Sequence, residues 1–533
     1  MTLANPVRQL SQTIPLPAPT LGINAVDGLA DMGPRDSIFS YNLYPSQYGL
    51  RVRNGYREHA INVGTDGGGR TIMPYIGSVD AENVLFATSQ EGIFDITASG
   101  DTFTAAITFT TQDANSGYGQ FTAYTTIGGH FLLYCDESNG YYIYTESTGT
   151  WAKIALGVGA GEVSGVDPGD LVSVINHKER LWFVEKDSAN AWYLPAGQIT
   201  GVATKFNFGS RFKKGGKLVN LYPWTVDGGS GIDDYLVAVS SSGDVIIFRG
   251  TDPDVDTDWF LQGTWYIGRP PTGRRIGGSV GGELYLLSTY GVLPVSRLLS
   301  GAVVQDQDTA VSKRITPLIQ AQLENFIDTL GWEIQLIPSE NLLLVSVPRA
   351  VGSADIQFVQ AINTRAWGLY RNLPYYTGGE WNGDFYFADG EGKVYIHSGY
   401  ADAVDLGNTT SEEVEFSLLT AFQDIPPVGH FKRVHFIRAV FLAQGIPGYD
   451  VSPRYDYQLE ENDPVVATSS ASGAAWDSAV WDIDIWGGGF TVTQEVTGGQ
   501  GMGRAIAVAL RGQTAVKTTL VSLAIVHDGG GIL

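Results

Sequence analysis

Short runs of apolar and β-branched residues alternate along the chain with turns rich in Ser, Asp, Asn and Gly. The runs occur in pairs, as in "NVLFATSQEGIFDIT" (83–97), and each pair with its polar turn predicts a β-hairpin. The predicted hairpins follow one another at intervals of about 40–60 residues, a spacing typical of the blades of a β-propeller. Seven segments show this pattern: 83–97, 130–151, 180–194, 234–250, 282–296, 341–370 and 383–399.

The repeat is imprecise, so an array of β-sandwiches remains an alternative to a propeller. Two hairpins end in a polar turn followed by tryptophan: "TESTGTW" ends at Trp151 and "AINTRAW" ends at Trp367. In a propeller, the outer strand of a blade packs a large ring against its neighbour. The two tryptophans therefore favour the propeller.

One segment breaks the β pattern. In 308–333 the apolar residues recur at helical spacing, and Gly331 is a suitable C-terminal stop, so we expect a helix near 310–331. This helix would cover an open sheet edge or form a contact between subunits. The apolar positions are Ile315, Leu318, Ile319, Leu323, Phe326, Ile327 and Leu330.

The strands become longer after about residue 405, beyond the polar join "YADAVDLGNTTS". We therefore predict an all-β protein with a propeller-like core of short hairpins, one inserted helix and a β-sandwich platform domain. The expected organisation is an N-terminal arm over 1–60 that joins the platform, the propeller over 61–405, and the C-terminal platform over 406–533.

The composition agrees with an all-β chain. Of 533 residues, 43% are hydrophobic and 67 are glycines, as expected for many strands joined by tight turns. Cys135 is the single cysteine, which excludes an intrachain disulfide and favours synthesis in a reducing compartment. The N-terminal stretch has no apolar run of signal-peptide length, and nowhere do about 18 apolar residues follow one another, so we expect neither secretion nor membrane insertion.

The net charge is −23, from 33 basic and 56 acidic residues. This charge argues against a protein that holds nucleic acid by neutralising phosphates. It is compatible with a protein past which nucleic acid slides.

The stretch "GTDPDVDTDW" (250–259) places an aspartate at every second position: Asp252, Asp254, Asp256 and Asp258. An EF-hand loop that started at Asp252 would need glycine at its sixth position and glutamate at its twelfth. Thr257 and Gly263 stand there instead. We therefore expect no metal site, and interpret the stretch as an acidic, solvated turn between two blade strands.

Other catalytic signatures also fail. "GGSVG" (277–281) matches the nucleophile elbow around Ser279, but a strand follows where that motif needs a helix, so we interpret it as a turn. The seven histidines are scattered, and no phosphate-binding glycine loop is present. We expect no catalytic residue, no cofactor and no enzymatic activity.

A glycine-rich stretch in the C-terminal domain, from "VWDIDIWGGGF" (480–490) to "TGGQGMG" (497–503), predicts an extended loop or edge. Large aromatic rings in such a stretch are candidates for an interface with another chain. The candidates are Trp476, Trp481 and Trp486.

Three blocks of the sequence resemble the tail nozzle proteins (tail tubular protein B-like) of short-tailed bacteriophages, the podoviruses. The first block, 15–59, contains "GINAVDGLADM" and "NLYPSQYGLRVRNGY", where the family more often has "NWFP…VRKGF". The second, 176–275, runs from "NHKERLWFVEK" to "PPTGRR" and includes "GTDP" after a blade strand. The third runs from "GRAIAVALRG" to the closing "VHDGGGIL". Together the blocks span nearly the whole chain.

The resemblance implies a structural virion protein, made in the host bacterial cytoplasm and located in the tail. Such a protein forms a ring of six copies below an adaptor or gatekeeper ring, carries a propeller-like domain, and makes a channel for DNA ejection. Tail fibres or spikes are possible further partners. The family supplies no catalytic residue. A propeller that binds or cleaves surface glycan remains the alternative.

In a ring of six acidic chains, a channel wall that repels phosphates would let duplex DNA pass without tight binding. We therefore expect an acidic channel. The four aspartates at 252–258 are candidates for its surface, and a solvated turn on the outer rim is the competing interpretation.

Overall fold

The computed structural model describes residues 11–65, 68–225, 234–255, 257–302, 304, 306–348, 355–465 and 491–529. The chain forms two compact units. Unit 1 comprises 1–57, 358–371 and 398–533, and unit 2 comprises 58–357 and 372–397. Strands dominate both units, which confirms the predicted all-β class.

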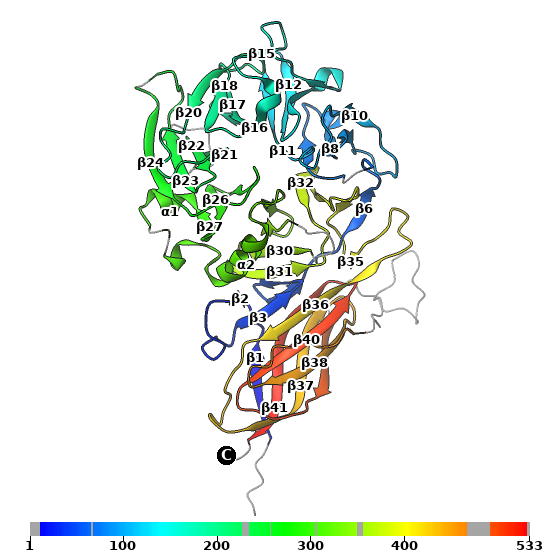
Figure 1. Cartoon of the computed structure of the whole chain (residues 1–533). Helices are drawn as coiled ribbons and strands as arrows, with labels where there is room; N and C mark the ends of the chain where they lie inside the picture. The colour runs from blue at the N-terminus through cyan, green and yellow to red at the C-terminus, as the bar shows by residue number, and fades with distance from the viewer. Residues whose placement is uncertain are drawn as a thin grey trace, which may run out of the picture. The chain divides into compact units, whose positions relative to one another are not determined.

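Unit 2 is a β-propeller, built from small sheets that follow one another around a ring (Figure 1). Its first four blades are antiparallel sheets of four strands in chain order. They are β7 (Ile72–Tyr75), β8 (Val84–Thr88), β9 (Gly92–Asp95) and β10 (Ala105–Thr108); β11 (Gly119–Thr126), β12 (Gly129–Asp136), β13 (Gly140–Thr145) and β14 (Thr150–Lys153); β16 (Leu171–His177), β17 (Arg180–Glu185), β18 (Asn190–Tyr193) and β20 (Thr204–Asn207); and β21 (Leu218–Thr225), β22 (Asp234–Ser240), β23 (Asp244–Arg249) and β24 (Phe260–Tyr266).

The remaining sheets of the ring are less regular. They are the three-stranded sheet β25 (Gly277–Val280), β26 (Glu283–Ser288) and β27 (Gly291–Pro294); the hairpin β28 (Glu333–Ile337) and β29 (Leu342–Ser346); and the sheet β32 (Thr377–Trp381), β33 (Asp384–Ala388), β34 (Val394–Ile396) and β6 (Arg57–Ala60). A short parallel pair, β15 (Val163–Ser164) and β19 (Gly201–Val202), lies outside the blades.

The first strands of neighbouring sheets contact one another, for example β11 with β16, β25 with β28, and β32 with β7. First strands that meet in this way surround the axis of a propeller. The predicted hairpins at 83–97, 130–151, 180–194 and 234–250 are the second and third strands of their blades. The propeller is therefore confirmed, and the alternative of a sandwich array is wrong for this unit.

Strand β6 closes the ring. It precedes the first blade in the chain, yet it is the fourth strand of the last sheet, beside β34. The two ends of the propeller are therefore joined by strand pairing within one sheet.

Apolar side chains fill the space between blades. Trp151 on the outer strand β14 packs edge-on against Phe86 of the preceding blade, with ring centroids 5.2 Å apart. This contact confirms the packing predicted from the "TESTGTW" turn. The same prediction is wrong for Trp367, which lies on β31 (Ala366–Arg371) in unit 1.

The predicted helix is shorter than the pattern suggested. Helix α2 spans Thr316–Phe326 and follows the 3-10 turn η5 (Lys313–Ile315). It contacts β27, the outermost strand of the three-stranded sheet, as does α1 (Val295–Leu299). The helix thus covers a sheet edge where other blades have a fourth strand.

No helix among the described residues is long and apolar enough to cross a membrane. The other 3-10 turns are η1 (Asp80–Glu82), η2 (Glu146–Thr148), η3 (Pro168–Asp170) and η4 (Gln307–Thr309).

Unit 1 is a β-sandwich. One sheet has the order β39-β37-β41-β5-β4 with β1 on β41, and the strands of unit 1 in the other run β30-β31-β2-β3-β36-β40-β38 with β35 on β36. Their bounds are β1 Gln12–Pro17, β2 Gly22–Ile23, β3 Asp36–Tyr41, β4 Leu43–Ser46, β5 Gly49–Val52, β30 Ile356–Ala361, β31 Ala366–Arg371, β35 Ala401–Asp402, β36 Glu412–Thr420, β37 Lys432–Ala443, β38 Gly448–Tyr455, β39 Thr491–Gly498, β40 Ile506–Thr514 and β41 Thr518–Gly529.

The core of unit 1 lies between these sheets, where Phe416 of β36 meets Phe441 of β37 with ring centroids 6.3 Å apart. The expected domain limits were 60/61 and 405/406. The units change at 57/58 and 397/398, and unit 1 also takes in 358–371.

Candidate functional site at the axis of the propeller

Two cavities lie where the blades of unit 2 converge. The larger, here called the mouth cavity, has a volume of about 510 Å³ and is lined by turns between strands. The smaller, here called the inner cavity, has about 280 Å³ and is lined by the first strands β7, β11, β25, β28 and β32. Arg274 lines the mouth cavity and Arg275 lines the inner cavity, and both line a small space that shares residues with each.

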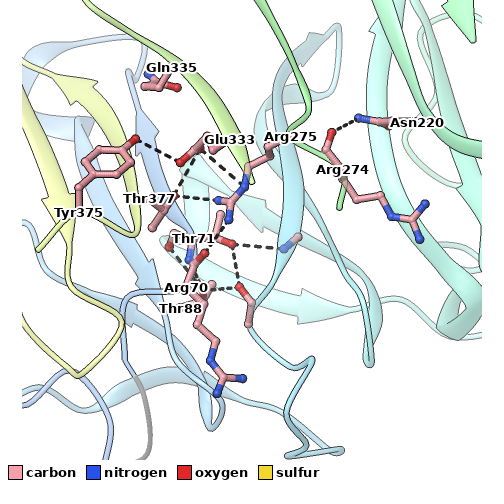
Figure 2. Close-up of polar contacts among 12 residues, drawn as sticks. Arg70, Thr71, Thr88, Asn220, Arg274, Arg275, Glu333, Gln335, Tyr375 and Thr377 are labelled. Atoms are coloured by element: carbon pink, nitrogen blue, oxygen red, sulfur yellow. Dashed lines mark hydrogen bonds and ion pairs between the residues drawn. The ribbon is translucent and has the colours of Figure 1, made fainter. Parts of the chain in front are cut away.

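The two arginines precede β25 and point in opposite directions, as successive residues of an extended chain do (Figure 2). Arg275 reaches across the axis. Its Nη1 donates to Thr377 Oγ1 at 2.8 Å, and its Nη2 donates to the carbonyl of Arg70 at 3.0 Å. Its Nε lies 3.6 Å from Oε1 of Glu333. One guanidinium therefore connects four sheets of the ring.

Glu333 is the buried acid of this cluster. Its Oε2 accepts a hydrogen bond from Tyr375 at 3.1 Å, and its Oε1 accepts one from Thr377 at 3.5 Å. Burial raises the pKa of Glu333 above its usual value, and the charge of Arg275 offsets the rise only in part. A buried carboxyl held by three neighbours is fixed in position.

A second set of polar contacts joins the first two blades. Thr71 on the first blade donates its Oγ1 to the carbonyl of Gly117 at 2.7 Å and accepts from the backbone N–H of Gly119 at 3.2 Å. Thr88 donates to the same carbonyl of Gly117 at 2.7 Å. These bonds satisfy backbone groups at the start of β11 that the ladder leaves unpaired.

Arg274 is held on the other side of the axis. Its Nε and Nη2 donate to the two carboxylate oxygens of Glu137 at 2.5 and 3.2 Å, a bidentate pair. The carbonyl of Arg274 accepts from Asn220 at 2.6 Å and from Tyr222 at 2.8 Å. The charge of Glu137 raises the pKa of Arg274 against the effect of burial, so this arginine stays charged.

Two more ion pairs lie at the rim of the mouth cavity and are exposed. Lys217 contacts Asp187 at 2.8 Å, and Arg269 pairs with Asp328. The bond from Lys217 lowers the pKa of Asp187, and the charges of Lys186 and Arg274 lower it further. Asp187 therefore lies in a positive local field.

Four of the carboxylates that line the two cavities are each engaged by a cation. General acid and base catalysis needs carboxyl groups that reach the substrate and titrate near the working pH. Glu137, Asp187, Asp328 and Glu333 each have a cationic partner instead. No group of three or more His, Cys, Asp or Glu side chains close enough to hold a metal ion occurs among the residues described above. What the axis offers chemically is ion pairing and hydrogen bonding.

The predicted acidic turn lies between β23 and β24. Asp252 forms an ion pair with Arg180 of the preceding blade at 3.0 Å, and Asp254 lies 3.9 Å from the same guanidinium. Asp254 also accepts a hydrogen bond from Tyr193. Two of the four aspartates are therefore bound to a neighbouring blade.

Asp258 closes the same turn. Its carboxylate accepts from the backbone N–H groups of Thr251 at 2.9 Å and Asp252 at 2.8 Å, and the bonds from Thr251 lower its pKa. Asp256 lies outside the described residues. Neither axis cavity is lined by Asp252, Asp254 or Asp258. The acidic channel, which concerns an assembly of several chains, stays a prediction.

Trp476, Trp481 and Trp486 all lie outside the described residues, so their role in an interface stays a prediction. Ser279 lies on strand β25 and lines the inner cavity, so its interpretation as a turn is wrong. The two glycines before Ser279 and the two after Val280 suggested a turn. In the structure the first two lie on β25, and the second two form the turn that follows it.

The cluster of Arg275, Glu333 and Thr377 was not found from the sequence. Arg274 and Arg275 read as an ordinary basic pair after "PPTG", and Glu333 reads as the polar start of a strand. These residues come together only when the ring of blades closes, and no local sequence pattern predicts that contact. The adjacent arginines before a glycine-rich strand were the one signal.

No family model and no curated protein matches the chain. Solved structures of low similarity do match. The extracellular domain of the hybrid two-component system BT3049 from B. thetaiotaomicron is 12% identical with a TM-score of 0.39, over 62% of this chain and 40% of that one. The β-propeller domain of Cps50 (Swd1) from Myceliophteria thermophila is 11% identical with a TM-score of 0.36, over 61% and 96%. YCF48 from Cyanidioschyzon merolae is 12% identical with a TM-score of 0.37, over 62% and 96%.

Proposed function

We propose that the chain is a structural subunit of the tail nozzle of a short-tailed bacteriophage, and that six copies form a ring through which DNA is ejected. The observation that carries the proposal is the family resemblance of the three sequence blocks. Block 15–59 supplies the end of β1, the strands β2 to β5 and most of the ring-closing β6. Block 176–275 spans most of two blades and ends at Arg275, and the last block includes β40 and β41.

The blocks therefore include strands of both units. A resemblance confined to one unit would follow from a shared domain alone. Because it extends to the sandwich, to the propeller and to the strand that closes the ring, it supports a shared arrangement of the whole chain.

The ion-paired axis agrees with a structural role. Arg275 and its partners bind neighbouring blades to one another, and Glu137 is occupied by Arg274. In this proposal the DNA channel belongs to the ring of six chains.

The alternative is a propeller that binds or cleaves glycan. What favours it is the mouth cavity, because its volume of about 510 Å³ suits a small ligand and Glu137, Asp187 and Asp328 line it. What weighs against cleavage is the pairing of each of these carboxylates with a cation.

The size of the protein in solution separates the two functions. Light scattering of the purified chain should give an ordered oligomer, and electron micrographs of that sample should show rings. A clean monomer that binds or hydrolyses polysaccharide would favour the alternative instead.

A further inference from the structure

We propose that the mouth cavity of the propeller binds an oxyanion, a phosphate or carboxylate group, through Lys186. The structural role proposed above neither assigns nor requires such a site. The cavity, its charge and the surroundings of this lysine carry the inference.

The cavity is enclosed by turns from successive blades. Glu137 follows β12, Lys186 and Asp187 follow β17, Lys217 precedes β21, and Arg274 precedes β25. A volume of about 510 Å³ lies within the range of small-molecule sites. The cavity is thus large enough for a small organic acid or a phosphorylated group.

The charge of the lining is positive, although the chain as a whole carries −23. Lys186, Lys217, Arg269 and Arg274 face three carboxylates, those of Glu137, Asp187 and Asp328, which leaves one positive charge in excess. An excess cation in a recessed site attracts anions more strongly than one on a flat surface, because the low-dielectric walls focus its field.

Lys186 is the cation without a carboxylate. Its ammonium donates to the backbone carbonyl of Glu137 at 2.8 Å, while the carboxylate of the same residue is held by Arg274. Among the residues that the structure describes, no acidic side chain forms an ion pair with Lys186. Since an ammonium group has three N–H donors, two of them remain for a ligand.

The neighbouring cations would assist. The pairs Lys217–Asp187 and Arg269–Asp328 are exposed, and exposed pairs exchange partners at little cost. Either cation can therefore turn toward a bound anion. Arg274 cannot turn in this way, because Glu137 and two backbone carbonyls hold its guanidinium. Its positive charge therefore stays fixed in the lining of the cavity.

The test is calorimetric titration of the full-length protein with inorganic phosphate and, separately, with glucuronic acid, each against sodium chloride at matched ionic strength. Saturable millimolar binding of either ligand is expected. Lys186→Met should weaken binding by about tenfold, the loss of one charge-assisted hydrogen bond, and Lys186→Arg should retain most of it.

The matched control is Lys205→Met. Lys205 is on β20, the fourth strand of its blade, where its ammonium lies over the ring of Trp192, and it does not line the cavity. This variant should bind as the unaltered protein does. Binding of phosphate alone would assign the site to phosphorylated ligands, and binding of glucuronic acid alone to acidic sugars.

Two results would overturn the proposal: no saturable binding of either ligand, or equal binding by the unaltered protein and Lys186→Met. If Lys186→Met does not fold, the double variant Lys217→Met, Arg269→Met takes its place, with the same expected direction. A protein that is monomeric in solution but still binds phosphate would contradict the proposed nozzle function and support the proposed oxyanion site.

Discussion

Arg275 and Glu333 are paired at the axis of the propeller, by their side chains and as partners in a parallel β-bridge. The side chains meet at 3.6 Å between Nε and Oε1, and the backbone N–H of Ile334 donates to the carbonyl of Arg275 at 3.0 Å. The two residues are 58 positions apart: Glu333 begins β28, and Arg275 precedes β25, the first strand of another sheet. Because Arg275 also binds Thr377 and the carbonyl of Arg70, it connects four sheets of the ring.

Replacing Arg275 by Met should destabilise the propeller strongly. It would leave Glu333 buried without its cation, and loss of one partner of a buried pair costs about 3–5 kcal/mol. Urea unfolding of unit 2 measures the change. The control is Arg269→Met, which removes a cation from an exposed pair and should cost about 1 kcal/mol or less. The double variant Arg275→Met, Glu333→Leu should recover part of the lost stability. Equal losses in Arg275→Met and Arg269→Met would contradict the role of Arg275 in holding the sheets together.

His177 should lower the stability of the propeller in mild acid, against the opposite effect of Asp136, whose pKa burial raises to about 6. Burial, assisted by the charge of Lys178 nearby, lowers the pKa of His177 from 6.5 to about 4. The unfolded chain then takes up a proton between pH 6.5 and 4 that the folded protein does not, so stability is full above pH 6.5 and is lost as the pH falls toward 4. The loss reaches about 3 kcal/mol for one group with this shift.

His177→Gln should lose less stability than the unaltered protein as the pH falls through that window, since glutamine does not titrate. The measurement is the midpoint of urea unfolding at several pH values between 4 and 7, for both proteins. Parallel curves for the two proteins would show that His177 is not the group responsible.

Deleting residues 1–45 should abolish assembly and leave the blades folded. The deletion removes β1, β2, β3 and most of β4, and with them the buried Leu16 and Leu43 of the sandwich core. Strand β6 remains to close the propeller. Calorimetry should show the loss of one unfolding transition and the survival of the other. Intact rings after the deletion would show that the N-terminal strands are dispensable.

The acidic turn at 252–258 should show no dependence on calcium. Arg180 already pairs with Asp252 and lies 3.9 Å from Asp254, and Thr257 and Gly263 stand where an EF-hand needs glycine and glutamate. Chelator and millimolar calcium should both leave the melting temperature unchanged. A rise of more than a few degrees with calcium, lost in Asp254→Asn, would reveal a metal site.

The propeller could be predicted because each blade carries its own signal. Segments such as 180–194 and 234–250 have a run of apolar residues on each side of a short polar turn, so their hairpins can be recognised from local pattern alone. The helix was found for the same reason, although its ends lie inside the expected 310–331. The sandwich was recognised from the longer strands after residue 405.

The parts that could not be predicted depend on contacts distant in sequence. Strand β6 is four residues, "REHA", too short for any periodicity, and its place beside β34 follows from ring closure. Likewise, Arg53 is buried against Asp402, 349 positions later, through bonds of 2.7 and 2.5 Å. A charged residue in a strand gives no sign of such a partner.

The central claim, that this chain forms the nozzle of a phage tail, is tested most directly by imaging intact phage particles that carry the chain with a labelled C-terminal tag. We predict a label at the distal end of a short tail, and averaged images viewed along the tail axis with six copies in a ring. Particles that lack the label, or that carry it only on side fibres or on the capsid, would contradict the claim.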